Sequence, residues 1–356
     1  MEFLHSNFPP LKTEYPSFID KFNSLVPRCS EMDIAVGYVT ADSLVGLQKL
    51  IELNENLQKL TLIIGMHYWE RFTKTEYYAA VALHNFLKNN GIGEVRLVNT
   101  FRYHGKLYSY SDSEGPLAGI IGSNNLSSII KGGQRIYDSS LLIDDRKAAG
   151  DMKEFILKLC QLSTKSISEL EITNFKTENT VLSGLDTVKR LITSEMDFKK
   201  TSLSFEIPLK PYEDAPESNM NVFFGKGRES KKTGLVRARP WYEVEVIVPK
   251  SITSRQGYPG TLGVPTEFTV FTDDGWSFEC NVNGAYNKNF RSKGGLEILG
   301  KWLKGRMEAE GALKPGDKVT LHASNGLQVT ATTTSGVAEI VEIDGTAIGD
   351  KVRVRF

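Results

Sequence analysis

The hydrophobic pattern of the chain changes near residue 200, and this change most limits the folds that the chain can adopt. Before that point, apolar strand-like runs alternate with stretches at helical spacing. The strands are expected at 32–39, 59–65, 94–99, 104–110, 117–122 and 138–143, and the helices at 43–56, 75–89 and 146–162. Such alternation is typical of helices packed on a mixed sheet, so we expect an α/β first domain.

After residue 200, short β-type runs are separated by Gly, Pro, Asn and Asp. We expect one helix near 295–310 and strands at 203–207, 241–248, 267–271, 276–282, 318–322, 327–332, 337–343 and 351–356. Many short strands with one inserted helix indicate a mainly β pseudobarrel. The polar stretch between the halves has some helical character near 183–193 and no clear strand. We therefore expect domains at 1–180 and 201–356, joined by a connector at 181–200.

The composition excludes several classes of protein. The 356 residues include 43 Lys plus Arg and 43 Asp plus Glu, so the chain is neither a uniformly basic nucleic-acid coat nor an acidic tail. Its three cysteines, Cys29, Cys160 and Cys280, fit neither a disulfide framework nor paired zinc ligands. Prolines interrupt the N-terminus where a signal peptide needs an apolar run, and no segment approaches a membrane span. We expect a cytoplasmic protein without a membrane partner.

The most informative stretch is His104-Gly105-Lys106, which we expect on a strand. Alternation along a strand would direct His104 and Lys106 to the same face. There an imidazole could attack phosphorus while an ammonium binds the non-bridging oxygens. The alternative is that both are solvated residues of an edge strand.

Gly122-Ser123-Asn124-Asn125 follows after a turn and a second strand, at the start of an expected helix. The short hairpin would bring Ser123 and Asn125 beside the imidazole as neutral hydrogen-bond donors. Asp138, at the start of the next strand, is a candidate acceptor for the second ring N–H of His104. The alternative for the Gly-Ser-Asn run is an ordinary helix cap.

Together, His104-x-Lys106 and Gly122-Ser123-x-Asn125 resemble the H-x-K and G-S-x-N motif of the phospholipase D superfamily of phosphodiesterases. That superfamily uses no metal and passes through a covalent phosphohistidine. The resemblance implies that His104 is the nucleophile, that Lys106, Ser123 and Asn125 act on the phosphoryl group, and that no metal or cofactor is needed. Two positions differ from the family pattern. The family's Asp five residues after the Lys is Ser111 here, with Asp112 one place later, and its usual Glu beyond the motif would be Asp138.

The chain carries one H-x-K motif, whereas a complete active site in this superfamily contains two. The other histidines, His5, His67, His84 and His322, have no Lys two residues later. One copy per chain implies a homodimer through the first domain, in which one His is the nucleophile and its partner the general acid. It also favours the nuclease branch over the phospholipases.

Two segments of the second half are basic although the chain is neutral. Residues 225–255 hold eight basic and three acidic side chains, and residues 286–306 hold six and one. Both mix Gly, Ser and Asn with Lys and Arg, which is typical of arms that contact phosphates and reach into a groove. The candidate DNA contacts are Arg228, Lys231, Lys232, Arg237, Arg239, Asn287, Lys288, Arg291, Lys293 and Lys301. The alternative is that these segments are merely solvated loops.

A phospholipase D-like half followed by a β-rich half with two basic arms resembles restriction endonucleases of the BfiI and NgoFVII type. Their C-terminal pseudobarrel is similar to the plant B-three DNA-binding domain. The resemblance implies a type II restriction endonuclease that cuts double-stranded DNA at a specific site, with a companion DNA methyltransferase. Two alternatives stay open: a sequence-specific DNA-binding regulator whose first domain only dimerises, and a nonspecific or RNA-directed phosphodiesterase.

Overall fold

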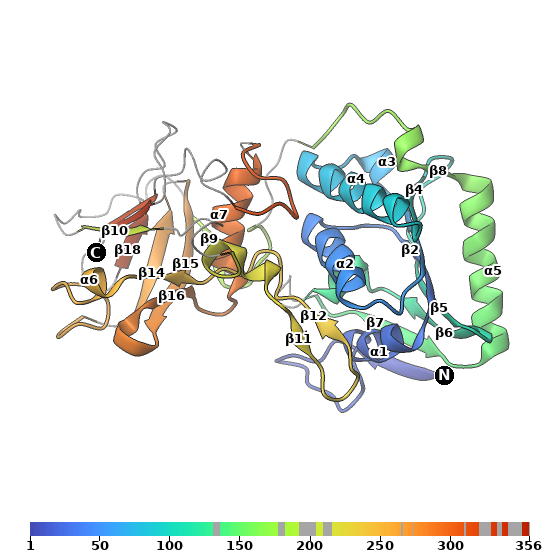
Figure 1. Ribbon diagram of the computed structural model, residues 1–356, viewed down its shortest axis with the longest axis horizontal. Coiled ribbons are helices and arrows are strands. Elements are labelled where there is room, and N and C mark those ends of the chain that lie inside the picture. Colours follow the sequence, from blue (N-terminus) through green and yellow to red (C-terminus); the bar gives the residue numbers. More distant parts are fainter. Residues whose placement is uncertain are drawn as a thin grey trace. The chain divides into compact units, whose positions relative to one another are not determined.

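The structure is a computed structural model that describes residues 1–130, 136–176, 182–191, 204–208, 216–264, 266–272, 274–309, 311–319, 329–332, 337–340 and 351–355. The chain divides into two compact units (Figure 1). The first consists of Met1–Glu178 with Gly227–Ala238, and the second of Asn179–Lys226 with Arg239–Phe356. Nowhere in the described ranges does a helix have the length and hydrophobicity that a membrane crossing requires.

A mixed eight-stranded sheet lies at the centre of the first unit. Its strands, in spatial order, are β1 (Glu2–His5), β7 (Ser139–Ile143), β6 (Gly115–Gly122), β5 (Lys106–Asp112), β2 (Glu31–Val36), β3 (Lys59–Ile64), β4 (Gly93–Val98) and β8 (Thr164–Ser166). β2, β3 and β4 run parallel, whereas β5, β6, β7 and β1 form antiparallel pairs. The expected α/β domain with a mixed sheet is confirmed.

Helices cover both faces of this sheet. On one face, α5 (Arg146–Ser163) closes a core that includes Ala35, Ile63 and Leu107. Figure 1 shows α2 (Ala41–Leu53) and α4 (Lys74–Asn89) on the opposite face. The shorter helical segments are α1 (Phe18–Leu25), α3 (His67–Glu70), η1 (Val26–Arg28), η2 (Leu126–Ile129) and η3 (Ile167–Glu169). Because successive strand residues point to opposite faces, both faces of the sheet contribute to the core.

Three expectations for the first 200 residues are wrong. β5 begins at Lys106, so His104 lies in the loop before the strand and not on it. The polar stretch after α5 contains two strands, because β8 pairs with β4 and β9 (Val188–Arg190) pairs with a strand of the second unit. β9 also stands where a helix was expected near 183–193, of which residues 192 and 193 lie outside the described ranges. Strands of three residues are too short to show a periodicity in the sequence.

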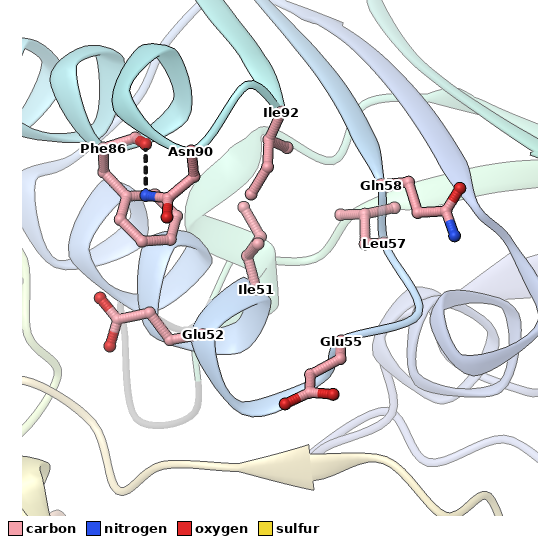
Figure 2. Close-up of a pocket in the computed structure, with 8 residues that line it drawn as sticks. All are labelled: Ile51, Glu52, Glu55, Leu57, Gln58, Phe86, Asn90 and Ile92. Atoms are coloured by element: carbon pink, nitrogen blue, oxygen red, sulfur yellow. Dashed lines mark hydrogen bonds between the residues drawn. The ribbon is translucent and has the colours of Figure 1, made fainter.

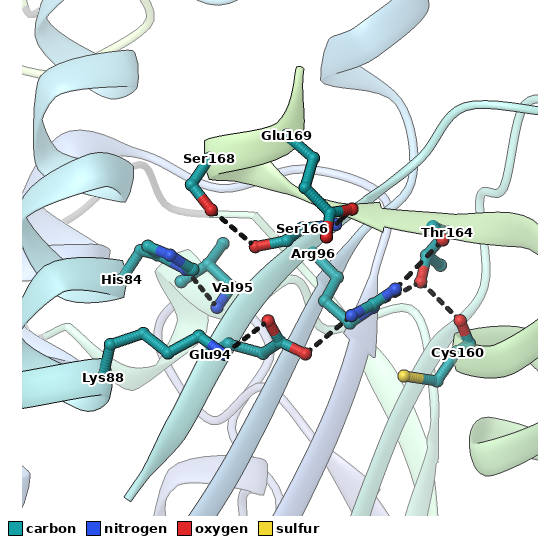
Figure 3. A network of polar contacts seen from close by, with 10 residues as sticks. All are labelled: His84, Lys88, Glu94, Val95, Arg96, Cys160, Thr164, Ser166, Ser168 and Glu169. Carbon is teal, nitrogen blue, oxygen red and sulfur yellow. Dashed lines mark hydrogen bonds and ion pairs between the residues drawn. The ribbon is translucent and has the colours of Figure 1, made fainter. Parts of the chain in front are cut away.

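A polar network fastens β8 to its neighbours (Figure 3). The Arg96 guanidinium on β4 donates to Thr164 Oγ1 on β8 at 2.7 Å and pairs with Glu94 at 2.6 Å. The Val95 backbone N–H donates to His84 Nδ1 on α4 at 3.2 Å. Burial lowers the pKa of His84, which favours the neutral ring that accepts this bond. The network therefore holds β8, β4 and α4 together without a long strand.

Part of the β-rich half of the sequence packs on the first unit. The segment Gly227–Ala238 forms a hairpin of β11 (Arg228–Glu229) and β12 (Val236–Arg237). At the end of α2, Asn54 Nδ2 donates to the Val236 carbonyl at 2.8 Å, and Asn54 Oδ1 accepts the Val236 backbone N–H at 3.0 Å. The amide thus pairs with β12 as a neighbouring strand would.

A mostly antiparallel sheet forms the second unit. Its path is β10 (Ser204–Pro208), β19 (Lys351–Arg355), β17 (Val329–Thr332), β18 (Val337–Ile340), β14 (Glu267–Thr272), β15 (Trp276–Asn283), β16 (Asn289–Ser292) and β13 (Val246–Ile247), with β9 paired to β15. In the described ranges, the helical segments of this unit are η5 (Asn219–Phe224), α6 (Lys250–Thr253), η6 (Ala285–Asn287) and α7 (Glu297–Ala309). The expected mainly β second domain with one principal helix is confirmed.

The strand expected at 241–248 is shorter in the structure and is limited to β13. Trp241, at the start of that run, is fully buried and donates from Nε1 to Glu308 on α7 at 2.8 Å, so this end of the run packs against a helix. Residues 318 and 319 are not in a strand, and 320–322 lie outside the described ranges. The outer residues of four other expected strands, 203, 327–328, 341–343 and 356, also lie outside those ranges.

An open pocket of about 560 Å³ lies between α2 and α4 (Figure 2). It is lined by Ile51, Glu52, Glu55, Leu57, Gln58, Phe86, Asn90 and Ile92. Leu57 and Gln58 precede β3, and Asn90 and Ile92 precede β4, so the pocket lies at the amino ends of these parallel strands. Asn90 Nδ2 is bonded to the Phe86 carbonyl at 2.8 Å and closes the end of α4. The H-x-K motif lies at the opposite edge of the sheet.

Candidate active site

The residues expected to carry chemistry come from one edge of the first sheet, where β2 and β3 end and β5 begins. The edge continues through the end of β6 and the start of β7. Each residue lies at or next to the end of a strand or turn: His104 before β5, Lys106 at its start, Ser123 after β6, Asn125 at the N-cap of η2 and Asp138 before β7. The carboxyl ends of parallel strands are a common location of sites in open α/β sheets.

Lys106 lies against the ring of His104. Its Nζ is 3.2 Å from Nδ1 and 3.1 Å from Nε2, and it donates to the His104 carbonyl at 2.7 Å. Because the ammonium is almost equally far from both ring nitrogens, it is not in line with either one. Burial lowers the pKa of Lys106, and the charge of Asp138 opposes that shift. An exposed imidazole therefore adjoins a poorly hydrated cation, which attracts anionic oxygen more strongly than a solvated one.

Ser123 and Asp138 form a network with the first residue of β7. Ser123 Oγ donates to the Asp138 carboxylate at 2.6 Å and accepts the Ser139 backbone N–H at 3.1 Å. The Asp138 backbone N–H donates to Ser6 Oγ at 2.9 Å, so the chain after β1 closes this side. In the described ranges the Asp138 carboxylate has no hydrogen bond with His104. The expected pairing of these two residues is not found, because β6 separates β7 from β5 in the sheet.

The loop after β2 orients Asn125. Asn125 Oδ1 accepts the Tyr38 backbone N–H at 3.2 Å, which leaves the Nδ2 hydrogens of the amide to donate elsewhere. The Tyr38 ring meets the His104 ring edge-on, with centroids 5.6 Å apart and planes at 78°. Tyr38 falls within the strand expected at 32–39, and the sequence pattern predicts neither of these contacts. Its position just after a parallel strand, at the carboxyl edge of the sheet, is the signal that points to it.

Two glycines allow the backbone to come close at this edge. A Cβ at Gly122 would lie 2.4 Å from the Ser139 carbonyl oxygen, a distance that real side chains do not adopt. A Cβ at Gly37 would lie 3.2 Å from His104 Cδ2 and 3.3 Å from His104 Cα. The motif glycine is therefore needed for the approach of β6 to β7, and Gly37 for the approach of the β2 loop to His104.

The positions that replace the family's Asp lie at the far end of β5. Ser111 is 2% exposed and accepts from Lys153 Nζ on α5 at 3.0 Å. Asp112 pairs with Arg146, also on α5, at 3.0 Å. Both contacts fasten α5 to β5, and both lie at the end of β5 away from Lys106. The two positions that depart from the family pattern therefore contact α5 and lie away from the His104 edge.

The first basic segment contains both exposed and internally bonded cations. Arg228, Lys231 and Lys232 are exposed on the hairpin. The Arg237 guanidinium donates to Asn23 Oδ1 on α1 and to the Ile129 carbonyl on η2. Burial lowers the pKa of Arg237 to about 10. In this state Arg237 fastens the hairpin, while the other three cations face solvent.

Carboxylates of the second unit hold two more of the candidate arginines. Arg239 pairs with Glu243 at 2.5 Å and with Glu245 at 2.8 Å. These hydrogen bonds raise the pKa of Arg239 against the opposing effect of burial. Arg291 on β16 lies 3.7 Å from the same Glu245 carboxylate. Both guanidiniums therefore have acidic partners in the free chain.

The remaining candidates are Asn287 in η6, Lys301 in α7, and Lys288 and Lys293, which flank β16. Lys288 is exposed, and Lys293 is exposed with its Nζ 2.6 Å from Glu267. Asn287 Nδ2 donates to a backbone carbonyl at 3.4 Å, which is a long bond. Lys301 is only 7% exposed. Of these four candidates, Lys288 and Lys293 are therefore the most exposed.

Among the solved structures that match this chain, three each cover less than half of it. The phospholipase D family member Nuc from Salmonella typhimurium has 16% identity and a TM-score of 0.31, over 46% of this chain and 98% of Nuc. Phosphatidylserine synthase from Haemophilus influenzae Rd KW20 has 16% identity and a TM-score of 0.34, over 48% of this chain and 41% of the synthase. The archaeal chromatin protein TrmBL2 has 12% identity and a TM-score of 0.29, over 46% of this chain and 53% of TrmBL2. Comparison with curated protein sequences gives no match.

Two family models match the chain, one for each half. Residues 17–172 match the NgoFVII restriction endonuclease N-terminal PLD domain, which contains the whole edge around His104. Residues 195–330 match the NgoFVII C-terminal B3-like DNA-binding domain. The two models describe the N-terminal and the C-terminal domain of the same restriction endonuclease family, and they match this chain in that order. Together they cover most of the chain. The chain therefore belongs to the NgoFVII family of restriction endonucleases, nucleases with a PLD domain followed by a B3-like DNA-binding domain.

Proposed function

We propose that this chain is a type II restriction endonuclease that hydrolyses DNA at a specific double-stranded site without a metal, through a covalent phosphohistidine. The observation that carries the proposal is the geometry at the edge of the first sheet. There the exposed His104 imidazole lies beside the buried Lys106 ammonium, and Tyr38 contacts both the His104 ring and the Asn125 amide. The B3-like domain would select the site, and a companion DNA methyltransferase would protect the cell's own DNA in the cytoplasm.

In the proposed reaction, a ring nitrogen of His104 attacks phosphorus and the bond to one bridging oxygen breaks. Lys106 and the Asn125 amide bind the non-bridging oxygens, where negative charge grows in the transition state. Ser123 holds Asp138 next to them, and the Asp138 charge favours the ammonium form of Lys106. Water then displaces the imidazole, which leaves a phosphate monoester and a regenerated His104.

A general acid must give a proton to the leaving oxygen in the first step. Since each chain has one H-x-K motif, we propose that His104 of the partner subunit supplies that proton in a homodimer through the first domain. The same group then takes a proton from the attacking water. Proton and phosphoryl transfer balance over the two steps.

For DNA binding we propose the exposed cations Arg228, Lys231, Lys232, Lys288 and Lys293 as direct phosphate contacts. The other five candidates are bonded within the chain or buried: Arg237, Arg239, Asn287, Arg291 and Lys301. They would contact DNA only after they leave these contacts or become exposed. Direct contact is therefore proposed first for the exposed group.

A plasmid digest in excess EDTA tests the proposal, with His104→Ala as the matched control. The wild type should give discrete fragments, and His104→Ala should lower the cleavage rate more than about 1,000-fold while DNA affinity is kept. Discrete fragments that appear only with added metal would remove the metal-independent mechanism. A smear would favour a nonspecific phosphodiesterase, and specific binding without any cleavage would favour a DNA-binding regulator.

A further inference from the structure

The loop between β2 and α2 contacts both motifs through one residue, Tyr38. Its backbone N–H donates to Asn125 Oδ1 at 3.2 Å, and its ring meets the His104 ring edge-on at 5.6 Å. Its hydroxyl donates to Glu70 Oε2 on α3 at 2.7 Å. The hydrogen bond to Glu70 raises the pKa of Tyr38 to about 12, so the phenol remains a donor at neutral pH. One residue therefore connects His104, Asn125 and α3.

The Tyr38 ring also contacts a second histidine, His67. The His67 ring meets the Tyr38 ring edge-on at 5.7 Å and stacks on Phe72 at 4.4 Å. His67 Nε2 accepts the Val39 backbone N–H at 3.1 Å. Burial lowers the pKa of His67 to about 4, so this ring is a neutral acceptor under ordinary conditions. Tyr38 thus contacts two imidazoles, the buried His67 and the exposed His104.

Hydrogen bonds restrain the rotation of His104 only weakly. In the part of the chain that the structure describes, its ring has no hydrogen-bonding partner other than Lys106, which is not in line with either nitrogen. The Asp138 carboxylate is bonded to Ser123. An attacking imidazole must direct a nitrogen lone pair at phosphorus, so its rotation sets the rate. The Tyr38 ring adds an edge-on contact with the imidazole, with centroids 5.6 Å apart.

We propose that Tyr38, fixed by Glu70, is a positioning residue that aligns the His104 imidazole and the Asn125 amide for attack on the phosphodiester. This inference rests on the proposed nuclease function. It differs from a packing role in that it concerns orientation: the hydroxyl bond to Glu70 sets the tilt of the ring, and the ring sets the tilt of His104.

The test uses the full-length chain with Tyr38→Phe, Tyr38→Leu and Glu70→Gln. Tyr78→Leu is the matched control, because Tyr78 is an exposed tyrosine of α4 whose ring contacts Tyr77. Single-turnover cleavage should fall about tenfold in Tyr38→Phe and about 100-fold in Tyr38→Leu. DNA affinity and melting temperature should stay close to those of the wild type. Cleavage at the wild-type rate in Tyr38→Leu, or an equal loss of cleavage and DNA binding, would overturn the proposal.

A second readout does not depend on cleavage. NMR spectra are recorded on protein whose histidines are isotope-labelled at Cε1. The His104 resonance is assigned as the one that is lost in His104→Ala. Its chemical shift should move in Tyr38→Leu, which removes the ring current, and also in Tyr38→Phe, which frees the ring from Glu70. It should stay in place in Tyr78→Leu. If the wild type cuts no DNA but these shifts occur, the nuclease proposal fails and the contact stands. If the His104 resonance does not move in Tyr38→Leu, the positioning role is overturned.

Discussion

At the scale of single residues, the environment of Lys106 differs most from that of a surface lysine. Its side chain is 6% exposed, and its ammonium contacts the His104 ring and carbonyl. An ammonium that has lost hydration attracts a phosphoryl oxygen more strongly, but it also releases its proton more easily. The burial that makes Lys106 suitable for binding phosphate therefore also lowers the pH at which its charge is lost.

This gives a prediction for the pH profile of cleavage. Burial lowers the pKa of Lys106, so the ammonium is lost as pH rises through a value below the usual value of about 10.4. The single-turnover rate should therefore decline on the alkaline side before an ordinary lysine would titrate. Lys106→Arg should cleave more slowly and lack that decline, since arginine stays charged. An alkaline limb that is the same in both proteins would assign the titration to another group.

At the scale of elements, the approach of β6 to β7 determines where Ser123 and Asp138 lie. Ser123 directly follows β6, and both its backbone N–H and its hydroxyl are bonded to residues at the start of β7. The motif glycine, Gly122, is the residue that allows this approach, because a Cβ would contact the Ser139 carbonyl. The G-S-x-N sequence is therefore a packing requirement as well as a set of hydrogen-bond donors.

Gly122→Ala and Gly150→Ala should consequently have opposite effects. At Gly122 the new methyl forces β6 from β7, which should cost about 1–3 kcal/mol of unfolding free energy and displace Ser123. At Gly150, inside α5, the nearest atom would be 3.7 Å away, so alanine should stabilise the chain by about 0.5–1 kcal/mol. Denaturant unfolding measures both changes. Equal effects at the two positions would contradict the close approach of the strands.

The hairpin β11–β12 gives a second prediction at this scale. Arg237→Met removes the donors to Asn23 and Ile129 and should lower the unfolding free energy of the first unit by about 2 kcal/mol. Lys231→Ala, at an exposed position of the same hairpin, should leave stability unchanged and reduce the salt dependence of DNA binding by about one charge. Unfolding and salt-dependent binding curves measure the two effects. Loss of stability in Lys231→Ala but not in Arg237→Met would reverse these assignments.

At the scale of the whole molecule, the proposed active site needs two chains. This gives a prediction for mixtures of wild type with His104→Ala, equilibrated so that subunits exchange. If one reaction uses His104 of both chains, mixed dimers are inactive, and an equal mixture should keep about a quarter of the activity. If each chain acts alone, about half should remain. Sedimentation of the wild type, which should give a dimer, checks the assembly independently.

The sequence predicted the local features of this protein well, because periodic burial and short motifs are properties of neighbouring residues. The pattern located β2, β3, α2, α4 and α5 to within a few residues. The H-x-K and G-S-x-N spacings identified the edge where the sheet brings their residues together. The pattern wrongly placed His104 on a strand. It also gave no sign of β8 and β9, because the pairing of such short strands depends on partners that are distant in the chain.

Only the tertiary structure decided the contacts between residues that are far apart in the sequence. The bond from Tyr38 to Asn125 spans 87 positions, and that from Arg237 to Asn23 spans 214. Residue type could not distinguish the half-buried, internally bonded Arg237 from the exposed Lys231, since both are cations in the same basic segment. Burial and direction are set when the chain closes on itself, and a one-dimensional pattern does not contain that information. The sequence alone therefore determined which chemistry is available, and the folded chain decided which side chains are held in place for it.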